Sequence, residues 1–442
     1  MSCEEDAMET REKLRRILQE WKEFDIPQGY PRDFDQRLLE GKEILSVIGA
    51  RRTGKTYLCY QMARSVRRNL PAENVIYVNL EDERLSPARG DELTLLWDVC
   101  LEMLAIDMTR RVYLFVDEIQ NAAHWSKWAR RITDQHPNIK LIITGSSSKL
   151  LSREIATELR GRTLSVKVFP LSFKEFLSAR GIPVDIDHIL YSPERPLIKK
   201  AFNEYLEIGG FPAVLDSPNR KELLKEYYSV MFYRDLAERH KVKDLRLLKD
   251  YLTLLIDQTA AHFSITATAK KLEEFGHSPG KTTLSNFLKF AEDSFLAFVV
   301  KKFSLKVREQ MRAPRKIYTI DHGLARAVRF FFSEDRGRML ENIAFLHLYR
   351  QRQDIYYHQG TRECDFLTVD AGRVTGAFQV CMSMSARETR EREMRGLAEA
   401  MEAHKLKTGT ILTEDENEEL SVNAGKILVQ PLWYKLLEDS LK

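Results

Sequence analysis

The residues with the clearest chemical potential form one short run, GARRTGKT, from Gly49 to Thr56. The run has the spacing G-x-x-x-x-G-K-[ST], whose glycines let the backbone curl so that successive N–H groups point at phosphate oxygens. The lysine of this pattern places a positive charge beside the β- and γ-phosphates of a nucleotide, and the hydroxyl after it can bind Mg²⁺. We therefore predict a phosphate-binding loop made by these residues: Gly49, Ala50, Arg51, Arg52, Thr53, Gly54, Lys55, Thr56 and Tyr57.

An acidic pair, Asp117 and Glu118, follows the apolar run Tyr113–Val116. Ligands of α/β proteins bind at the carboxyl ends of the strands, so a pair in this place faces the same crevice as the phosphate-binding loop. There Asp117 would hold Mg²⁺ through water, and Glu118 would orient or deprotonate the attacking water. Two acids after an apolar run are also common at solvated strand ends. The position 62 residues after Lys55, in an alternating β/α chain, favours the functional interpretation.

Three further polar residues are candidates for catalysis. Ser146 ends the next apolar run, KLIITGSSS, where it would sense the γ-phosphate or the water; an ordinary serine-rich turn is the alternative. Arg160 and Arg162, in ELRGRT, are candidates for an arginine finger that stabilises the transferred phosphate in cis or in trans. Because arginines are common on surfaces, a purely solvated role remains open for both.

The elements that must position these residues are indicated by apolar runs rich in β-branched and aromatic residues. Five strands are predicted: Ile44–Ile48, Val75–Leu80, Val112–Val116, Lys140–Thr144 and Leu164–Phe169. Strands that are apolar throughout and separated by helices favour a parallel sheet covered on both faces. An amphipathic helix is predicted ahead of them, over Glu9–Phe24.

The rest of the chain changes its pattern twice. From about Phe173 to Phe303 the apolar residues recur with helical spacing, and short strand-like runs return after Lys316. We predict three modules: a helix followed by an α/β domain with a parallel sheet over residues 1–172, a helical region over residues 173–316, and a second α/β domain over residues 317–442.

Taken together and in order, these runs resemble one family. The chain is similar to the bacterial and archaeal AAA-type ATPases that join a P-loop domain to a C-terminal domain of unknown function. The resemblance covers about Trp21 to Val380 and implies an AAA+ or STAND-like ATPase core, a winged-helix region and a nuclease-like C-terminal fold. The stretches that carry it are GARRTGKT, VNLEDERL, LFVDEIQNAAHW, TGSSSKLL, RGRT, FPLSFKEF, YLEIGGFPAVL, YRDLAERH, RKIYTIDHGLA, LENIAFLHLYR and ECDF.

The segment from His262 to Phe303 is compatible with a winged helix-turn-helix. Helices are expected over Ile265–Phe275 and Lys281–Asp293, and a strand pair over Leu296–Phe303. Short polar and basic side chains suited to a DNA groove lie on the expected exposed side of the second helix: Lys281, Thr282, Ser285, Asn286 and Lys289.

A basic stretch follows this segment. Residues 301–316 hold seven basic residues and one acidic residue, a charge suited to a phosphate backbone. Lys301, Lys302 and Lys306 are its candidate phosphate contacts. Winged helices also mediate protein contacts, and charge runs often only solvate a surface, so both alternatives stay open.

The C-terminal module resembles the PD-(D/E)xK nuclease fold in its acids, Glu341, Glu363 and Asp365. Such enzymes also need an acid and a lysine two residues apart on the neighbouring strand. The aligned run here is FQVCMS, in which Gln379 replaces the acid and Cys381 replaces the lysine. We therefore predict a nuclease-like fold that does not cleave.

Composition bounds the remaining choices. The 442 residues carry 69 Lys and Arg against 65 Asp and Glu, so a nucleic-acid site has to be a local patch. No apolar run approaches the ~20 residues that a membrane span needs. The scattered cysteines and the acidic start, MSCEED, favour a cytoplasmic protein. We predict a homo-oligomeric, Mg²⁺-dependent ATPase whose ATP state controls binding or remodelling of DNA. A STAND-like switch that binds a protein partner is the alternative.

Overall fold

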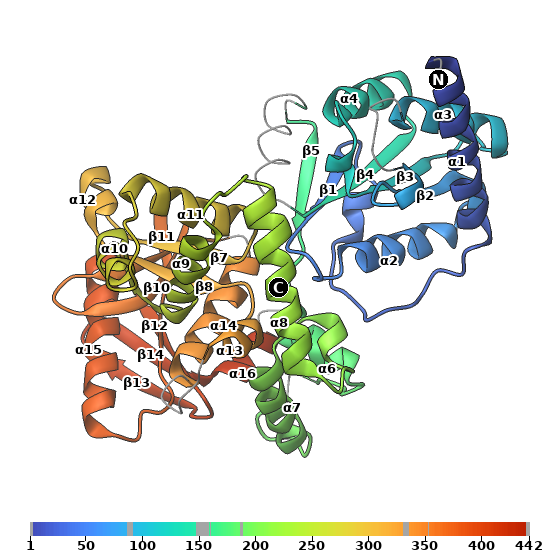
Figure 1. The fold of residues 1–442 in the computed structure, drawn as a ribbon. Coiled ribbons are helices and arrows are strands. Elements are labelled where there is room, and N and C mark those ends of the chain that lie inside the picture. The colour runs from blue at the N-terminus through green and yellow to red at the C-terminus, as the bar shows by residue number, and fades with distance from the viewer. Residues whose placement is uncertain are drawn as a thin grey trace. The chain divides into compact units, whose positions relative to one another are not determined.

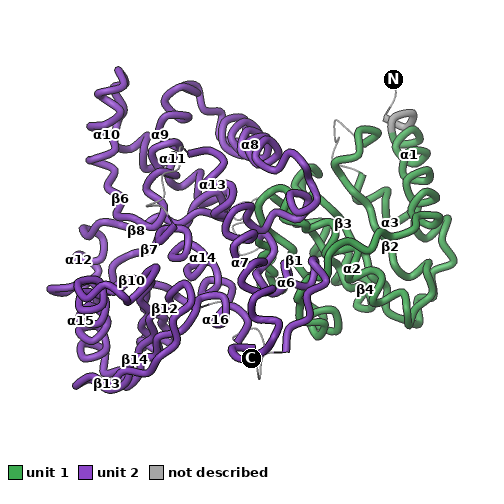
Figure 2. The backbone as a smooth tube through the Cα atoms, turned by 90° about the horizontal axis from the view of Figure 1, so that it is seen from below, with its two compact units in different colours: residues 1–169 green, residues 170–442 purple. Residues whose placement is uncertain are grey.

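The computed structural model describes residues 3–85, 92–146, 159, 161–185, 189–329, 336–351 and 353–438. The chain divides into two compact units, residues 1–169 and 170–442, which Figure 2 colours separately. The boundary predicted after residue 172 lies close to this division. Each unit is built on a sheet of its own.

Unit 1 contains a five-stranded sheet with the order β2-β3-β4-β1-β5, in which all neighbours pair in parallel. Its strands are β1 (Ile44–Ile48), β2 (Val75–Asn79), β3 (Val112–Asp117), β4 (Ile139–Gly145) and β5 (Thr163–Lys167). Each predicted strand is present within two residues at either end. The parallel α/β sheet predicted from the sequence is therefore confirmed.

The helices of unit 1 are α1 (Cys3–Glu23), α2 (Lys55–Arg67), α3 (Glu92–Met103) and α4 (Trp125–Gln135). In Figure 1, α2 lies on one side of the sheet and α4 on the other. Every residue of β1, β3 and β4 is buried, as expected for central strands covered on both faces. On the α2 side, Leu58 and Met62 pack against Leu45 and Phe115.

Unit 2 contains a nine-stranded mixed sheet with the order β13-β14-β12-β11-β10-β9-β7-β8-β6. The strands are β6 (Ala261–Phe263), β7 (Ala297–Lys302), β8 (Arg315–Thr319), β9 (Asp354–Gln359), β10 (Glu363–Asp370), β11 (Arg373–Val380), β12 (Thr408–Thr413), β13 (Glu418–Val422) and β14 (Gly425–Pro431). The segment Leu296–Phe303 holds one strand, β7, and not the expected pair. The partners of β7 are β8, which is antiparallel to it, and β9, which is parallel.

The helices of unit 2 are α6 (Phe173–Ala179), α7 (Arg195–Ile208), α8 (Arg220–Val230), α9 (Leu245–Asp257), α10 (Ile265–Glu274), α11 (Lys281–Asp293), α12 (Val307–Arg312), α13 (His322–Val328), α14 (Arg336–Arg350), α15 (Arg387–His404) and α16 (Leu432–Glu438). A π-helical stretch, Met231–Glu238, continues α8. Among the described residues, no helix is long and apolar enough to cross a membrane.

The boundary predicted between residues 316 and 317 falls inside β8. Because β8 pairs with β6 on one side and with β7 on the other, and β7 also pairs with β9, the middle and C-terminal segments share one sheet. Hydrophobic spacing could not show this, because it reports each strand but not which strands pair.

Polar side chains cap the N-termini of two helices of unit 2, α6 and α13. Ser172 begins α6 with a capping box: Ser172 Oγ accepts the Glu175 N–H at 3.1 Å, and the Glu175 carboxylate accepts the Ser172 N–H at 2.8 Å. Asp321 begins α13 by accepting the Leu324 N–H, and its other oxygen accepts the Gly210 N–H at 2.7 Å. Asp321 thereby ties α13 to the loop that follows α7.

Candidate nucleotide site and a second charged centre

The predicted phosphate-binding loop lies between β1 and α2, and each of its two glycines has a structural reason. A Cβ on Gly49 would lie 2.2 Å from the Val168 carbonyl oxygen, so no side chain fits there. Gly54 has φ +94°, a conformation that favours glycine, and it is the residue before α2 begins at Lys55. The spacing of the motif therefore places a curled backbone directly ahead of a helix N-terminus, where anions bind.

The Lys55 side chain is buried inside this loop. Its ammonium donates to the carbonyl oxygens of Gly49 at 3.2 Å and Ala50 at 3.1 Å, and it lies 3.9 Å from Glu118 Oε1. A buried ammonium held mainly by neutral carbonyls gains from any phosphate oxygen that enters the loop. The position and the environment are those that the motif predicts.

The other loop residues differ in what their side chains contact. Thr53 Oγ1 donates to the Ala50 carbonyl oxygen at 2.8 Å and closes the loop, while Arg52 has φ +66°. Arg51 forms an ion pair with Glu81 at 3.3 Å. Tyr57 is half exposed. Its ring packs closely against Gly29, where a Cβ would lie 2.5 Å from Tyr57 Cδ1.

Asp117 ends β3 and is surrounded by hydroxyl groups. Its Oδ2 accepts from Thr56 Oγ1 at 2.7 Å and from Tyr77 Oη at 2.6 Å, and its Oδ1 accepts from Thr144 Oγ1. Burial, together with the charge of Asp117, raises the pKa of Tyr77, which keeps its hydroxyl a donor. The contact between Thr56 and Asp117 joins the two halves of the predicted magnesium site.

Glu118 takes a conformation that is rare for a residue with a side chain, with φ +52°. Its backbone N–H donates to Thr144 Oγ1 at 2.9 Å, and its carboxylate accepts from the Gln120 side chain. Such strain persists where surrounding contacts enforce it, and it concentrates at functional sites. Here it turns the carboxylate towards Lys55.

The sequence suggested a role for Ser146, which lies just beyond β4, and none for Thr144 within it. Ser146 is buried just after β4 ends, whereas Thr144 is the residue that contacts both Asp117 and Glu118. Both residues lie in the run KLIITGSSS, so the signal was present. It could not be resolved, because residues two positions apart share a face of a strand, and spacing does not tell which of the two contacts Asp117 and Glu118.

Arg162 does not lie beside the phosphate-binding loop of its own chain. It directly precedes β5, whose first residue, Thr163, pairs with Ile44 at the start of β1, whereas the loop follows the end of β1. Its guanidinium pairs with Asp134. The role of Arg162 as an arginine finger, in cis or in trans, stays a prediction. Arg160 lies outside the described residues.

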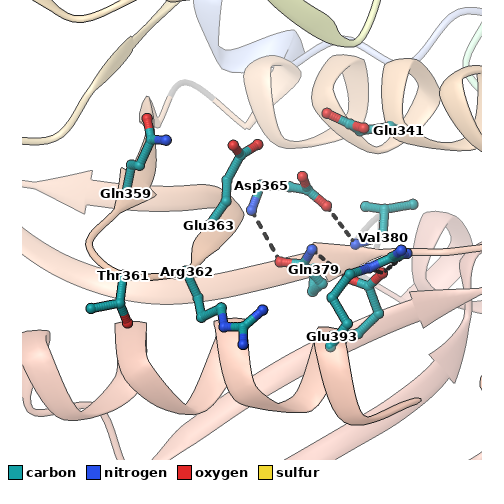
Figure 3. A pocket seen from close by; sticks show the side chains of 10 residues that line it. Glu341, Gln359, Thr361, Arg362, Glu363, Asp365, Gln379, Val380 and Glu393 are labelled. Atoms are coloured by element: carbon teal, nitrogen blue, oxygen red, sulfur yellow. Dashed lines mark hydrogen bonds and ion pairs between the residues drawn. The ribbon is translucent and has the colours of Figure 1, made fainter. Parts of the chain in front are cut away.

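A second charged centre occupies unit 2, where the buried Lys316 of β8 meets three carboxylates. Its ammonium lies 2.8 Å from Asp365 Oδ1, 2.7 Å from Glu363 Oε1 and 3.1 Å from Glu341 Oε1. The three acids line a cavity of about 490 Å³, shown in Figure 3 together with Gln379. The predicted acids do converge, on an ammonium group.

The surroundings of two acids in this centre, Glu341 and Glu363, shift their pKa values in opposite directions. Burial, reinforced by the charge of Asp365, raises the pKa of Glu341 to about 7. Burial would also raise the pKa of Glu363, but the hydrogen bond from His262 at 2.7 Å and the charge of Lys316 lower it to about 2. Although burial disfavours its charge, Lys316 has a pKa well above the ordinary value because of Asp365 and Glu341.

The strand on which PD-(D/E)xK enzymes carry an acid and a lysine has Gln379, with Cys381 just beyond its end. Gln379 accepts the Asp365 N–H at 3.2 Å and donates to Glu393 at 2.6 Å, as Figure 3 shows. Cys381 is buried, and burial raises its pKa to about 12, so it carries no charge. The ammonium group of this centre belongs to Lys316. From the sequence, this lysine was expected to be part of the basic stretch that faces DNA.

The candidate DNA contacts of α11 have the exposure that the sequence predicts. Leu284, Phe287, Leu288 and Ala291 form its buried side. The five polar candidates are exposed on it: Lys281, Thr282, Ser285, Asn286 and Lys289.

The basic stretch after α11 has mixed surroundings. Lys301 and Lys306 are exposed, whereas Lys302 is partly buried and pairs with Glu309 at 2.9 Å. The segment between β7 and β8 contains α12. Leu305, which precedes α12, and Met311, which lies within it, are both exposed.

Comparison with known proteins identifies two family models. An AAA domain matches residues 41–177, and a domain of unknown function, DUF8612, matches residues 199–335. Among solved structures, the chain is similar to the Walker-type ATPase PABY2304 of Pyrococcus abyssi, with 16% identity, a TM-score of 0.44 and coverage of 69% of this chain and 99% of the other. It is also similar to Cdc6p of Pyrobaculum aerophilum, with 14% identity, a TM-score of 0.27 and coverage of 73% and 96%.

Two relatives span most of the chain. An uncharacterized protein of Haemophilus influenzae is 27% identical over 77% of this chain and 83% of its own length. The uncharacterized protein MJ1544 of Methanocaldococcus jannaschii is 36% identical over 91% of this chain and 90% of its own length. The chain therefore belongs to the same family as MJ1544, and its first unit carries an AAA-type P-loop ATPase domain.

Proposed function

We propose that the protein binds and hydrolyses ATP with the help of Mg²⁺. The observation that carries the proposal is the meeting of Lys55, Thr56, Asp117 and Glu118 at the carboxyl ends of β1 and β3. The hydroxyl of Thr56 and the carboxylate of Asp117, joined at 2.7 Å, are oxygen groups of the kind that Mg²⁺ prefers, so the residues fit the ion. When bound, Mg²⁺ would neutralise phosphate charge.

The chain's own residues would do the rest. The loop N–H groups and Lys55 would bind the phosphates, since their charge is complementary. Glu118, held by Gln120 and by its backbone contact with Thr144, takes the proton of the attacking water. Ser146 would sense the γ-phosphate. In a homo-oligomer, Arg160 or Arg162 would act in trans on a neighbour's site.

The test is phosphate release from ATP by the purified protein, with and without Mg²⁺. Release that saturates with ATP and requires Mg²⁺ supports the proposal. Absence of phosphate release under both conditions contradicts the proposal. The mass of the protein in solution, measured with ATP, establishes which oligomer was tested.

As a second function we propose DNA engagement through a winged helix. The supporting observation is the element order α9-β6-α10-α11-β7-α12-β8, in which β6, β8 and β7 form an antiparallel sheet preceded by α9, α10 and α11. In a winged helix of this order, α11 with its exposed polar side would be the recognition helix. The basic stretch between β7 and β8 would follow the phosphate backbone as the wing.

If the wing contacts phosphates, the affinity for DNA is expected to fall steeply with salt. Each neutralised phosphate adds about −0.9 to the slope of log affinity against log salt. Replacing Lys301, Lys302 and Lys306 together by alanine should flatten that slope by about two to three units, the lower value applying if the ion pair of Lys302 with Glu309 persists. Titrations of labelled duplex at several salt concentrations measure the slope.

A matched control removes three exposed lysines from the other end of the same sheet: Lys405, Lys407 and Lys426. This variant should keep the wild-type slope. Absence of DNA binding by the ATP-bound protein, or an affinity that salt does not change, would favour the alternative of a STAND-like switch that binds a protein partner.

We also propose that the charged centre of unit 2 belongs to a nuclease-like domain that does not cleave. Lys316 brings in an ammonium group, but its three ion pairs place that group where the carboxylates would otherwise hold a cation. Gln379 in place of a charged ligand removes a further electrostatic contribution. Preorganised groups of this kind are often worth about 10²–10³ in rate each.

Supercoiled, linear and branched DNA should accordingly remain uncut after incubation with the protein in Mg²⁺ or Mn²⁺. Gel electrophoresis of the products measures this. Cleavage that disappears in Asp365→Ala would contradict the proposal and assign a nuclease activity to this centre.

A further inference from the structure

The carboxylate of Asp117 receives hydrogen bonds from three hydroxyl groups on three different elements. Thr56 belongs to the start of α2, Thr144 to β4 and Tyr77 to β2. Thr56 is part of the phosphate-binding motif, and Thr144 also contacts Glu118. Tyr77 belongs to no motif, and the proposed reaction has not used it.

Tyr77 reaches Asp117 because of the register between β2 and β3. Asn79 pairs with Asp117, and Tyr77 lies two residues earlier on β2, hence on the same face. A tyrosine is long enough to span this offset along the strand. Its hydroxyl lies 2.6 Å from Asp117 Oδ2, so the contact is a full hydrogen bond.

The ring of Tyr77 packs against two other aromatic rings. Its centroid lies 5.0 Å from that of Trp21 on α1 and 5.1 Å from that of Tyr60 on α2. Trp21 is held in turn, since its indole N–H donates to the Val75 carbonyl oxygen at 2.8 Å. The hydroxyl of Tyr77 therefore sits in one place, at the tip of an aromatic cluster that begins on the N-terminal helix.

We propose that Tyr77 is a positioning residue, which holds the Asp117 carboxylate in the orientation that a magnesium–nucleotide complex requires. The inference rests on the proposed ATPase function. Thr56 and Tyr77 donate to the same oxygen of Asp117, and the hydroxyl of Thr56 is the one that would hold Mg²⁺. Tyr77 then remains on Oδ2 and Thr144 on Oδ1, so the carboxylate keeps its orientation.

The experiment compares Tyr77→Phe with Tyr113→Phe. Both changes remove one hydroxyl from a buried tyrosine of the same sheet and the same hydrophobic cluster, but the hydroxyl of Tyr113 donates to the Leu39 carbonyl oxygen. The phenyl ring keeps the packing against Trp21 and Tyr60, so the fold is retained. Calorimetric titration measures ATP binding in EDTA and over a series of Mg²⁺ concentrations.

In EDTA, both variants should bind ATP within twofold of the wild type, because neither hydroxyl contacts the phosphate-binding loop. Tyr77→Phe should need about tenfold more Mg²⁺ for its half-maximal effect, the usual size of the loss when a partner of a metal-binding carboxylate is removed. Tyr113→Phe should match the wild type. An unchanged Mg²⁺ requirement in Tyr77→Phe, with a normal requirement in the wild type, overturns the role of Tyr77 alone. A wild type whose ATP binding ignores Mg²⁺ overturns the proposed function as well.

Discussion

Glu118→Gln is expected to bind ATP as tightly as the wild type while its turnover falls by about 10²–10³. The amide has the shape of the carboxylate, and its one oxygen can keep either the hydrogen bond from Gln120 or the approach to Lys55. It cannot accept a proton, and a positioned general base contributes about 10²–10⁴ in rate. Binding of ATP and release of phosphate, measured on the same preparation, separate the two effects.

Lys55→Ala provides the opposite pattern. It removes the ammonium that the loop buries at 3.2 Å from the Gly49 carbonyl oxygen, so nucleotide binding itself should be lost. A protein with Glu118→Gln that hydrolyses ATP at the wild-type rate would show that another group activates the water. In that case Ser146 and Thr144 would be the next residues to replace, because both lie at the end of the neighbouring strand.

Lys316→Met is expected to destabilise unit 2 by about 3–5 kcal/mol, because it leaves the buried Asp365 and the partly buried Glu341 and Glu363 without their cation. Chemical denaturation at neutral pH measures the loss. Lys302→Met is the matched control, because its ion pair with Glu309 is partly exposed and such pairs contribute about 0–1 kcal/mol. Equal losses in the two variants would show that Lys316 is not the cation that stabilises this centre.

The pH dependence of this centre follows from its two shifted groups. Glu363 has its pKa lowered to about 2, so its contribution to stability is present above its unfolded value of about 4.3 and is lost as the pH falls towards 2. Glu341 has its pKa raised to about 7, so ionising it costs stability as the pH rises from about 4.3 to 7. In Lys316→Met the remaining carboxylates can be neutralised by protons, so its loss of stability should be smaller at pH 5 than at pH 7.

The nucleotide site could be predicted because its chemistry lies in contiguous residues. Gly49 to Thr56 and the pair Asp117 and Glu118 are each read from one short run, and apolar strands between helices place both runs at the same edge of a parallel sheet. The contributions of Thr144 and Tyr77 could not be predicted. They depend on the strand face and the inter-strand register, which hydrophobic spacing does not specify.

The charged centre of unit 2 shows the same limit more sharply. Its acids were found because they follow a known order along the chain, but its lysine comes from β8 and lies 25 residues before the first of them. The seven basic residues of the stretch 301–316 suggest a solvated surface. The pattern gives no sign that one of them, Lys316, is buried. For Arg162 too, closeness in sequence to β5 does not tell which end of the sheet the residue occupies.

The sharing of β8 between two predicted modules has a consequence for how this chain could be rebuilt by recombination. A fragment ending at residue 316 would keep two residues of β8, leaving β7 with one of its four pairings to that strand and Lys316 without its carboxylates. The helical middle is therefore not a cassette that can be exchanged on its own. We expect it to be inherited, and to fold, only together with the strands that follow it.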